Sequence, residues 1–266
     1  MNGGTAIVTQ ALTRRFAHVA AVDAIDLEIQ AGEIFGLLGP NGAGKTTAIR
    51  MLTTLLAPTS GSARVAGFDL RREASQVRRH IGYVPQMLSA DADLTGYENL
   101  LTFARLYRVP SAERASRIAE ALEFMGIEDS AHQLVRHYSG GMIRRLEIAQ
   151  SLVNRPDILF LDEPTVGLDP AARHAVWGRI EALWKRWRTT IFMTTHYMDE
   201  AEALCTRIAF IERGRMVAQG TPAELKAAVG PNATLDDVFI SLSGGVQDGD
   251  GYRAAARERR SIQRHG

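Results

Sequence analysis

Apolar and polar residues follow two different patterns along this chain. Residues 5–9 and 22–29 place apolar side chains among polar ones, as in strands that bury one face. Other stretches are apolar almost throughout, which is typical of buried strands. These stretches are residues 33–38, 81–84, 158–161 and 190–193. Apolar spacing of three and four predicts helices over residues 48–55 and 172–187. The pattern therefore predicts an α/β core that follows a half-exposed sheet.

A helical segment interrupts the predicted strands. From residue 94 to 126 the apolar positions repeat with helical spacing, and Ser111 stands where an N-cap residue would. We expect residues 88–140, approximately, to form a helical subdomain that projects from the core. Residues 244–266 lose the apolar pattern, which predicts a disordered tail after a domain of residues 1–243.

Two short features near the C-terminus have recognisable turn chemistry. Residues 212–215 separate two apolar runs and predict a hairpin. Thr221, Pro222 and Glu224 give the N-cap, first-turn proline and capping-box glutamate of a helix start.

A glycine-rich stretch follows the strand predicted at 33–38. It fits the phosphate-binding pattern G-x-x-x-x-G-K-[ST], in which backbone N–H groups wrap phosphates, the lysine reaches the terminal ones and a hydroxyl meets Mg²⁺. A glycine turn between a strand and a helix is the simpler alternative. Lys45 is one of only three lysines in the chain, which argues against chance placement. The stretch consists of Gly39, Pro40, Asn41, Gly42, Ala43, Gly44, Lys45, Thr46 and Thr47.

Two acidic residues follow another buried strand. Asp162 and Glu163 come directly after residues 158–161, and carboxylates at the C-terminal end of such a strand lie where α/β proteins bind ligands. Two surface acids in a loop would not explain why they follow four large apolar residues. We therefore expect them to belong to the site of the phosphate loop.

Three weaker signals stand elsewhere in the chain. Ser139, Gly140 and Gly141 begin a predicted helix and could bind an anion, although this pattern alone is weak. A histidine after a strand, such as His196, is by itself more often structural. Phe16 is equally compatible with a core position and with stacking on adenine.

Composition and charge narrow the class of protein. With 266 residues and 45% hydrophobic content, the chain can bury one large core. Its net charge is +1, with 31 basic and 30 acidic residues, so we expect no nucleic-acid partner. The single cysteine, Cys205, suits a reducing compartment and is expected to be a buried small residue. Without a membrane-spanning run or a signal-peptide core, a soluble cytoplasmic protein is expected.

Taken together, these motifs resemble in order and spacing the ATP-binding subunits of ABC transporters, over residues 5–242. The chain is most similar to bacterial drug exporters of the daunorubicin-resistance type, with nodulation-factor exporters close by. Residues 138–142, 194–202 and 235–239 support this subclass. The resemblance implies a P-loop NTPase core with an antiparallel β-subdomain and an inserted helical subdomain. It also implies an ATPase that powers export through a separate permease, peripheral on the inner face of the membrane.

The resemblance implies roles for individual residues around ATP. Lys45 and the backbone of residues 42–46 would hold the β- and γ-phosphates, while Thr46 and Asp162 would hold Mg²⁺. Glu163 would polarise the attacking water.

Other roles implied by the resemblance concern sensing and coupling. His196 would sense the γ-phosphate, and Gln86 would link metal and water to the permease. Met87 and Tyr97 are expected to line a groove for a short permease helix, whereas Leu100 is expected in the core.

The remaining implied roles concern the adenine and a second subunit. Phe16 would stack on the adenine. Ser139 and Gly141 would close over ATP held by the other subunit of a head-to-tail dimer, either a homodimer or a paired ATPase subunit. Asp169 would lie at the same interface.

The chain departs from its relatives at three positions. Phe16 replaces the usual tyrosine and keeps its stacking face, and Met142 replaces a polar residue at the end of the Ser-Gly-Gly motif. Thr206 stands where an aspartate is common, and we have no physical account of it. None of these changes removes a catalytic group.

Two other functional classes are alternatives to an exporter subunit. A soluble ABC ATPase acting on ribosomes or DNA would carry tandem ATP sites or a long coiled coil, and the chain has one site and no heptads. A GTPase or small-molecule kinase is disfavoured because no Asn-Lys-x-Asp motif is present. The substrate cannot be named, since substrate contacts should lie in the permease.

Overall fold

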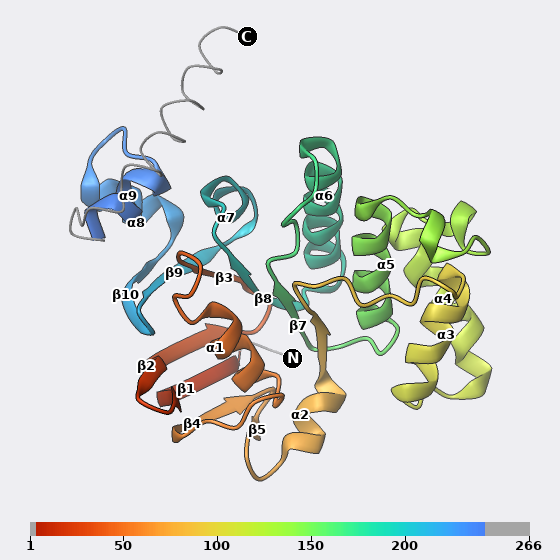
Figure 1. The fold of residues 1–266 in the computed structure, drawn as a ribbon, viewed down its shortest axis with the longest axis horizontal. Helices are drawn as coiled ribbons and strands as arrows, with labels where there is room; N and C mark the ends of the chain where they lie inside the picture. Colours follow the sequence, from red (N-terminus) through yellow and green to blue (C-terminus); the bar gives the residue numbers. More distant parts are fainter. Residues whose placement is uncertain (1–3, 243–266) are drawn as a thin grey trace, which may run out of the picture.

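A computed structural model describes residues 4–242 of the chain (Figure 1). A four-stranded antiparallel sheet, in the order β2-β1-β4-β5, forms one part of the fold. Its strands are β1 (Thr5–Phe16), β2 (Val19–Gln30), β4 (Ser60–Val65) and β5 (Phe68–Asp69). β1 and β2 extend well beyond the predicted residues 5–9 and 22–29, and β1 ends at Phe16. The half-exposed sheet is thus confirmed.

The second sheet has six strands, in the order β10-β9-β3-β8-β7-β6. All neighbours in it are parallel except β9 and β10, which form the predicted hairpin. Arg213 and Gly214 turn this hairpin with φ values of 49° and 81°, as a two-residue turn of matching twist requires. The strands are β3 (Ile34–Leu38), β6 (Ile81–Val84), β7 (Ile158–Asp162), β8 (Thr190–Thr195), β9 (Arg207–Glu212) and β10 (Arg215–Gly220).

Helices cover both faces of the six-stranded sheet (Figure 1). They are α1 (Lys45–Leu52), α2 (Ala74–His80), α3 (Gly96–Leu106), α4 (Ser111–Met125), α5 (Gly140–Leu152), α6 (Pro170–Trp187), α7 (Met198–Leu204), α8 (Pro222–Val229) and α9 (Leu235–Leu242), with short 3-10 turns η1 (Glu128–Ser130) and η2 (Val135–His137). None of them is long and apolar enough to cross a bilayer, as far as residues 4–242 are concerned.

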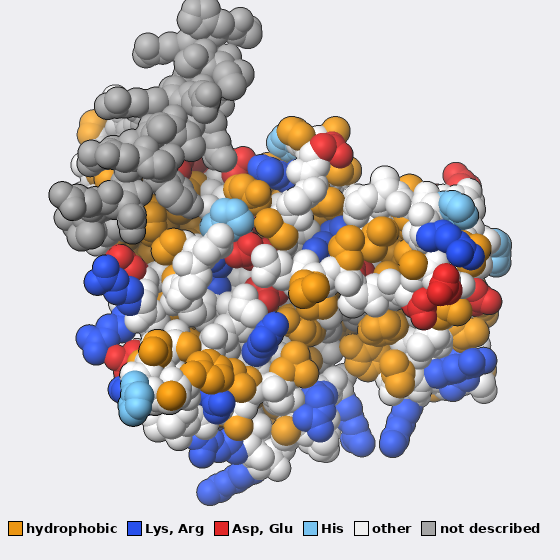
Figure 2. Space-filling model, in the orientation of Figure 1, with side chains coloured by type: hydrophobic (Ala, Val, Ile, Leu, Met, Phe, Trp, Pro, Cys, Tyr) orange, Lys and Arg blue, Asp and Glu red, His pale blue; other side chains and the backbone are white. Residues whose placement is uncertain are grey.

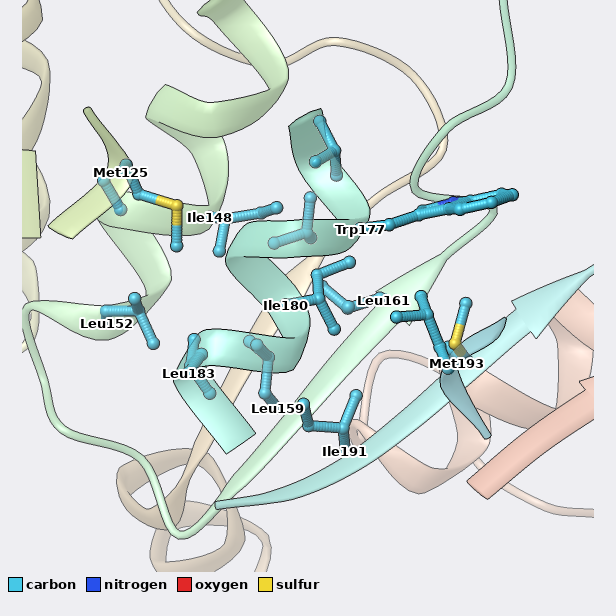
Figure 3. Packing of buried hydrophobic residues seen from close by; sticks show 14 of the residues in the cluster. Met125, Ile148, Leu152, Leu159, Leu161, Trp177, Ile180, Leu183, Ile191 and Met193 are labelled. Carbon is cyan, nitrogen blue, oxygen red and sulfur yellow. The ribbon is translucent and has the colours of Figure 1, made fainter. Parts of the chain in front are cut away.

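Alternate residues of the central strands face two separate hydrophobic clusters. Phe160 and Phe192 pack with α1 on one face, while Leu159 and Leu161 of β7 pack with α5 and α6 on the other. Figure 3 shows the second cluster, where Ile180 of α6 lies between the sheet and the side chains from α4 and α5. These strands are buried on both faces, which explains why they are apolar throughout.

The sequence predictions for helix starts have mixed outcomes. Thr221 and Glu224 form the predicted capping box at α8, whereas α6, predicted from residue 172, already begins at Pro170. The prediction that Ser111 caps α4 is wrong. Pro110 holds the N-cap position in an extended conformation (φ −53°, ψ 137°), so Ser111 is already the first helical residue.

Two predicted buried residues are confirmed, and one helix was not predicted. That helix is α2, which buries Val77. Leu100 is fully buried, as predicted, and so is Cys205, at the end of α7. The predicted disordered tail, residues 244–266, lies outside the described residues.

Candidate active site

The glycine-rich stretch forms a tight loop between β3 and the first turn of α1. A Cβ atom on Gly39 would lie 2.3 Å from the carbonyl oxygen of Ile211. Gly44 has a φ of 110°, and a Cβ atom there would lie 2.3 Å from the carbonyl oxygen of Ala21. Side chains at these two positions would therefore break the loop, which places backbone N–H groups at the start of a helix, where anions are favoured.

Lys45, at the start of α1, reaches back across this loop. Its Nζ donates hydrogen bonds to the carbonyl oxygens of Gly39 (2.8 Å) and Pro40 (3.2 Å). The same Nζ lies 3.0 Å from Oε1 of Glu163, and both side chains are almost wholly buried. The ammonium is thus fixed between the loop and the end of β7.

Glu163 is the point where the other predicted residues meet. Its Oε2 lies 3.1 Å from Nδ1 of His196 and accepts a 3.4 Å hydrogen bond from Nε2 of Gln86. Its backbone has a φ of 48°, and its N–H donates to the carbonyl oxygen of Thr194 (3.0 Å). Burial alone would raise the pKa of Glu163, but the hydrogen bond from His196 and the charge of Lys45 outweigh it and lower the pKa. The side chain is therefore a carboxylate at neutral pH.

Asp162 faces the hydroxyl group of the phosphate loop. Its Oδ1 accepts hydrogen bonds from Oγ1 of Thr46 (3.2 Å) and Oγ1 of Thr194 (2.6 Å). Its Oδ2 is buried without a hydrogen-bond partner, and burial raises the pKa of Asp162. An unpartnered carboxylate oxygen next to a hydroxyl fits Mg²⁺, which takes oxygen ligands and usually keeps several waters.

The sheet topology explains why these residues converge. β3, β8, β7 and β6 are consecutive neighbours and run parallel, so their C-terminal ends meet at one edge. Ligands of open α/β sheets bind outside that edge.

Ser139, Gly140, Gly141 and Asp169 form a second group. Ser139 caps α5 by accepting a 3.2 Å hydrogen bond from the N–H of Met142, and Asp169 caps α6 in the same way. The helix starts adjoin: a Cβ atom on Gly141 would lie 2.9 Å from Cβ of Ala172. Within residues 4–242, no hydrogen bond or ion pair joins this group to Lys45 or Glu163.

Three further predicted residues are exposed or half-exposed. Phe16, at the end of β1, is 45% exposed, with the guanidinium of Arg14 4.6 Å from its ring centroid. Asn41 is exposed and Thr47 is half-buried. Phe16 is therefore a surface residue, not a core residue, and Arg14 lies over one face of its ring.

Two residues of the site were not predicted from the sequence. Thr194 forms hydrogen bonds with both Asp162 and the backbone N–H of Glu163. Its position as a polar residue at the end of an apolar strand could have indicated this role. Arg144 is fully buried beside the segment that carries Gln86, and nothing in the sequence marks it among the many arginines.

Comparisons with known proteins agree with this geometry. The profile of the ABC transporter family matches residues 22–166. The chain is 49% identical over 227 residues to the daunorubicin/doxorubicin resistance ATP-binding protein of Streptomyces peucetius, covering 85% of this chain and 68% of that protein. It is 46% identical over 222 residues to a Nod factor export ATP-binding protein of Cupriavidus metallidurans, covering 83% and 73%.

Solved structures show the same fold. The ATP-binding subunit of an ABC transporter superimposes with a TM-score of 0.79 at 27% identity, covering 90% of this chain and all of that one. A dimeric ATP-binding cassette in a post-hydrolysis state, bound to ADP and Pi, matches with a TM-score of 0.72 at 26% identity, covering 81% and 98%. The predicted P-loop core with its antiparallel sheet is thereby confirmed. The chain belongs to the ATP-binding, ATP-hydrolysing subunits of the ABC transporter family.

Proposed function

We propose that this chain is the ATPase subunit of an exporter and powers the passage of a drug-like, lipid or other small substrate through a separate membrane permease. The observation that carries the proposal is the cluster of buried Lys45, Asp162 and Glu163 with half-buried His196, at the edge of the sheet where the phosphate loop ends. Relatives named for drug resistance and Nod factor export support the transport role.

In this proposal the phosphate loop binds the triphosphate. Lys45 and the N–H groups of residues 42–46 contact the β- and γ-phosphates, because a buried ammonium and a helix start both favour anions. Thr46 and Asp162 hold Mg²⁺, which neutralises charge on the phosphates. The unpartnered Oδ2 of Asp162 supports this assignment.

Glu163 orients the attacking water in this proposal. Its lowered pKa keeps it ionised, so it accepts a hydrogen bond from water, and Gln86 and His196 fix its second oxygen. Phosphoryl transfer needs positioning and charge neutralisation more than covalent chemistry, and these residues supply both. Phe16 stacks on the adenine.

The second group of residues supports a dimer. Ser139, Gly141 and Asp169 make no bond to the cluster around Lys45 within the described part of the chain, which supports a role toward ATP held by another subunit. A head-to-tail dimer brings them over the phosphates. One solved relative is dimeric.

Exposed apolar residues support a permease contact. Met87 is 81% exposed and Leu88 is 52% exposed, both just after Gln86, and Tyr97 is half-buried nearby in sequence at the start of α3. Hydrophobic side chains are visible at the surface between the sheet and helices α3 to α5 (Figure 2). Exposed methionine and aromatic residues are frequent at binding surfaces. The permease places the subunit at the inner face of the membrane.

Copurification with a candidate permease, sought among the genes beside the one for this chain, tests the proposal. Met87→Asp is expected to weaken association strongly because it puts a charge into an apolar contact. Val217→Asp is the matched control: Val217 is also exposed, but it lies on β10, at the opposite edge of the sheet from β6. No association of the wild-type chain, with ATPase activity retained, would instead favour a soluble ABC ATPase with a non-transport partner.

A further inference from the structure

The segment that carries Gln86 is held at both ends by one helix. Arg144, on α5, donates from Nη1 to the carbonyl oxygen of Pro85 and from Nη2 to that of Gln86, both at 2.7 Å. Glu147, one turn further along α5, accepts hydrogen bonds from the N–H and the hydroxyl of Ser89, the latter at 3.1 Å. Residues 85–89 are therefore fixed to α5 by their backbone.

The two side chains also form a buried ion pair. Nη1 of Arg144 lies 3.0 Å from Oε2 of Glu147, and the two side chains are 2% and 1% exposed. Taking two charges out of water is costly, and such a pair contributes little net stability compared with apolar residues of the same volume. A role in positioning the backbone explains the presence of this buried ion pair better than a role in stability. The planar guanidinium fork suits two neighbouring carbonyl groups, which an apolar residue could not hold.

The helix that holds Gln86 also begins with the Ser-Gly-Gly motif. Ser139 caps α5 five residues before Arg144, so the residues that hold the Gln86 backbone and this motif lie on the same helix. The side chain of Gln86 meanwhile reaches Glu163 at 3.4 Å.

We propose that Arg144 and Glu147 are positioning residues, which hold the backbone of residues 85–89 so that the side chain of Gln86 is set against Glu163. The inference rests on the proposed function in one respect, the role of Gln86 in hydrolysis. The hydrogen bonds of Arg144 and Glu147 go to residues 85–89, so the two residues act on Gln86 through the backbone.

A double-mutant cycle on kcat separates positioning from a merely structural role. In the wild-type background, Gln86→Ala is expected to lower kcat for ATP about tenfold, whereas in Arg144→Gln/Glu147→Gln the same change should alter kcat less than about twofold. The double variant removes both charges together, so no unpaired charge stays buried. KM for ATP should stay within about twofold throughout, since the phosphate loop is untouched.

Arg145→Gln is the matched control. Arg145 is the next residue on α5, but it donates to the carbonyl oxygens of Met125 and Gly126, away from residues 85–89. In this background Gln86→Ala should keep its full effect. If Arg144→Gln/Glu147→Gln does not fold, Arg144→Lys replaces it. This variant keeps the positive charge but loses the guanidinium that holds two carbonyl groups, so Gln86→Ala should lower kcat less than it does in the wild type.

The outcomes are distinguishable. An equal fall of kcat on Gln86→Ala in all backgrounds would overturn the positioning role and leave the ATPase assignment intact. A wild-type background in which Gln86→Ala changes nothing would overturn the role of Gln86, and this inference with it.

Discussion

Nζ of Lys45 lies 3.0 Å from Oε1 of Glu163, and this ion pair is almost completely buried. Lys45 follows β3 and Glu163 follows β7, with β8 between these strands in the sheet. The pair therefore joins two elements that are far apart in sequence. It places the ammonium group proposed to bind phosphate next to the carboxylate proposed to orient the attacking water. Each of the two charges compensates the other in a site where neither could be buried alone.

Replacement of Lys45 tests the phosphate loop. Lys45→Ala should abolish ATP hydrolysis and weaken ATP binding by about 10- to 100-fold, because charge-assisted hydrogen bonds to phosphate are lost. The control is Lys185→Ala, since Lys185 is exposed on α6 and its ion pair among residues 4–242 is with Glu181. Titration with a fluorescent ATP analogue measures binding, and a phosphate-release assay measures turnover. Wild-type turnover in Lys45→Ala would contradict the assignment of the loop.

Replacement of Asp162 tests the metal site. For the wild type, Mg²⁺ with ATP should raise the melting temperature more than ATP with EDTA does. In Asp162→Asn this difference should disappear, because the amide keeps the shape but loses the charge that holds the ion. The variant itself should melt no lower than the wild type, since burial raises the pKa of Asp162 and disfavours its charged form. An unchanged Mg²⁺ effect would remove Asp162 from the metal site.

Much of the site could be predicted because its parts are local in sequence. The strand, glycine loop and helix around Lys45 follow one another directly, and Asp162 and Glu163 close a run of apolar residues that has few other interpretations. The sheet that brings them together was implied by the family resemblance.

One part of the site could not be predicted because it depends on contacts between distant segments. Arg144 resembles any helix-surface arginine in the sequence, and its side chain is fixed by the carbonyl groups of Pro85 and Gln86. The N-cap prediction for Ser111 failed for a local reason instead, because Pro110 directly before it takes the N-cap position.

The single cysteine offers a probe of stability. Cys205 is buried, and burial raises the pKa of its thiol well above the ordinary value of 9.0. The folded chain should therefore react with a thiol reagent only as fast as it unfolds. Because the unfolded thiol ionises at lower pH than the folded one, stability should fall as the pH rises above about 9. Rapid labelling of the native chain at pH 8 would show that the segment opens locally.

Dimer formation tests the role of the second group. Glu163→Gln with Mg-ATP should sediment as a dimer, since ATP stays bound between the subunits. Gly140→Asp added to it should keep the protein monomeric, because the carboxylate faces the phosphates of the partner's ATP. Gly140 is exposed at the start of α5, so an aspartate there suits the helix and should not lower the melting temperature. A dimer of equal strength in the double variant would contradict the trans arrangement.

The central claim is that Glu163 orients the water that attacks ATP held by Lys45. ATP turnover by Glu163→Gln tests it most directly, measured beside ATP binding by the same variant. Turnover should fall by about 10²- to 10⁴-fold, because the amide cannot accept a proton from water. Binding should be retained or tighter, because Lys45 no longer shares its charge with a carboxylate. Turnover close to the wild-type rate would contradict the account.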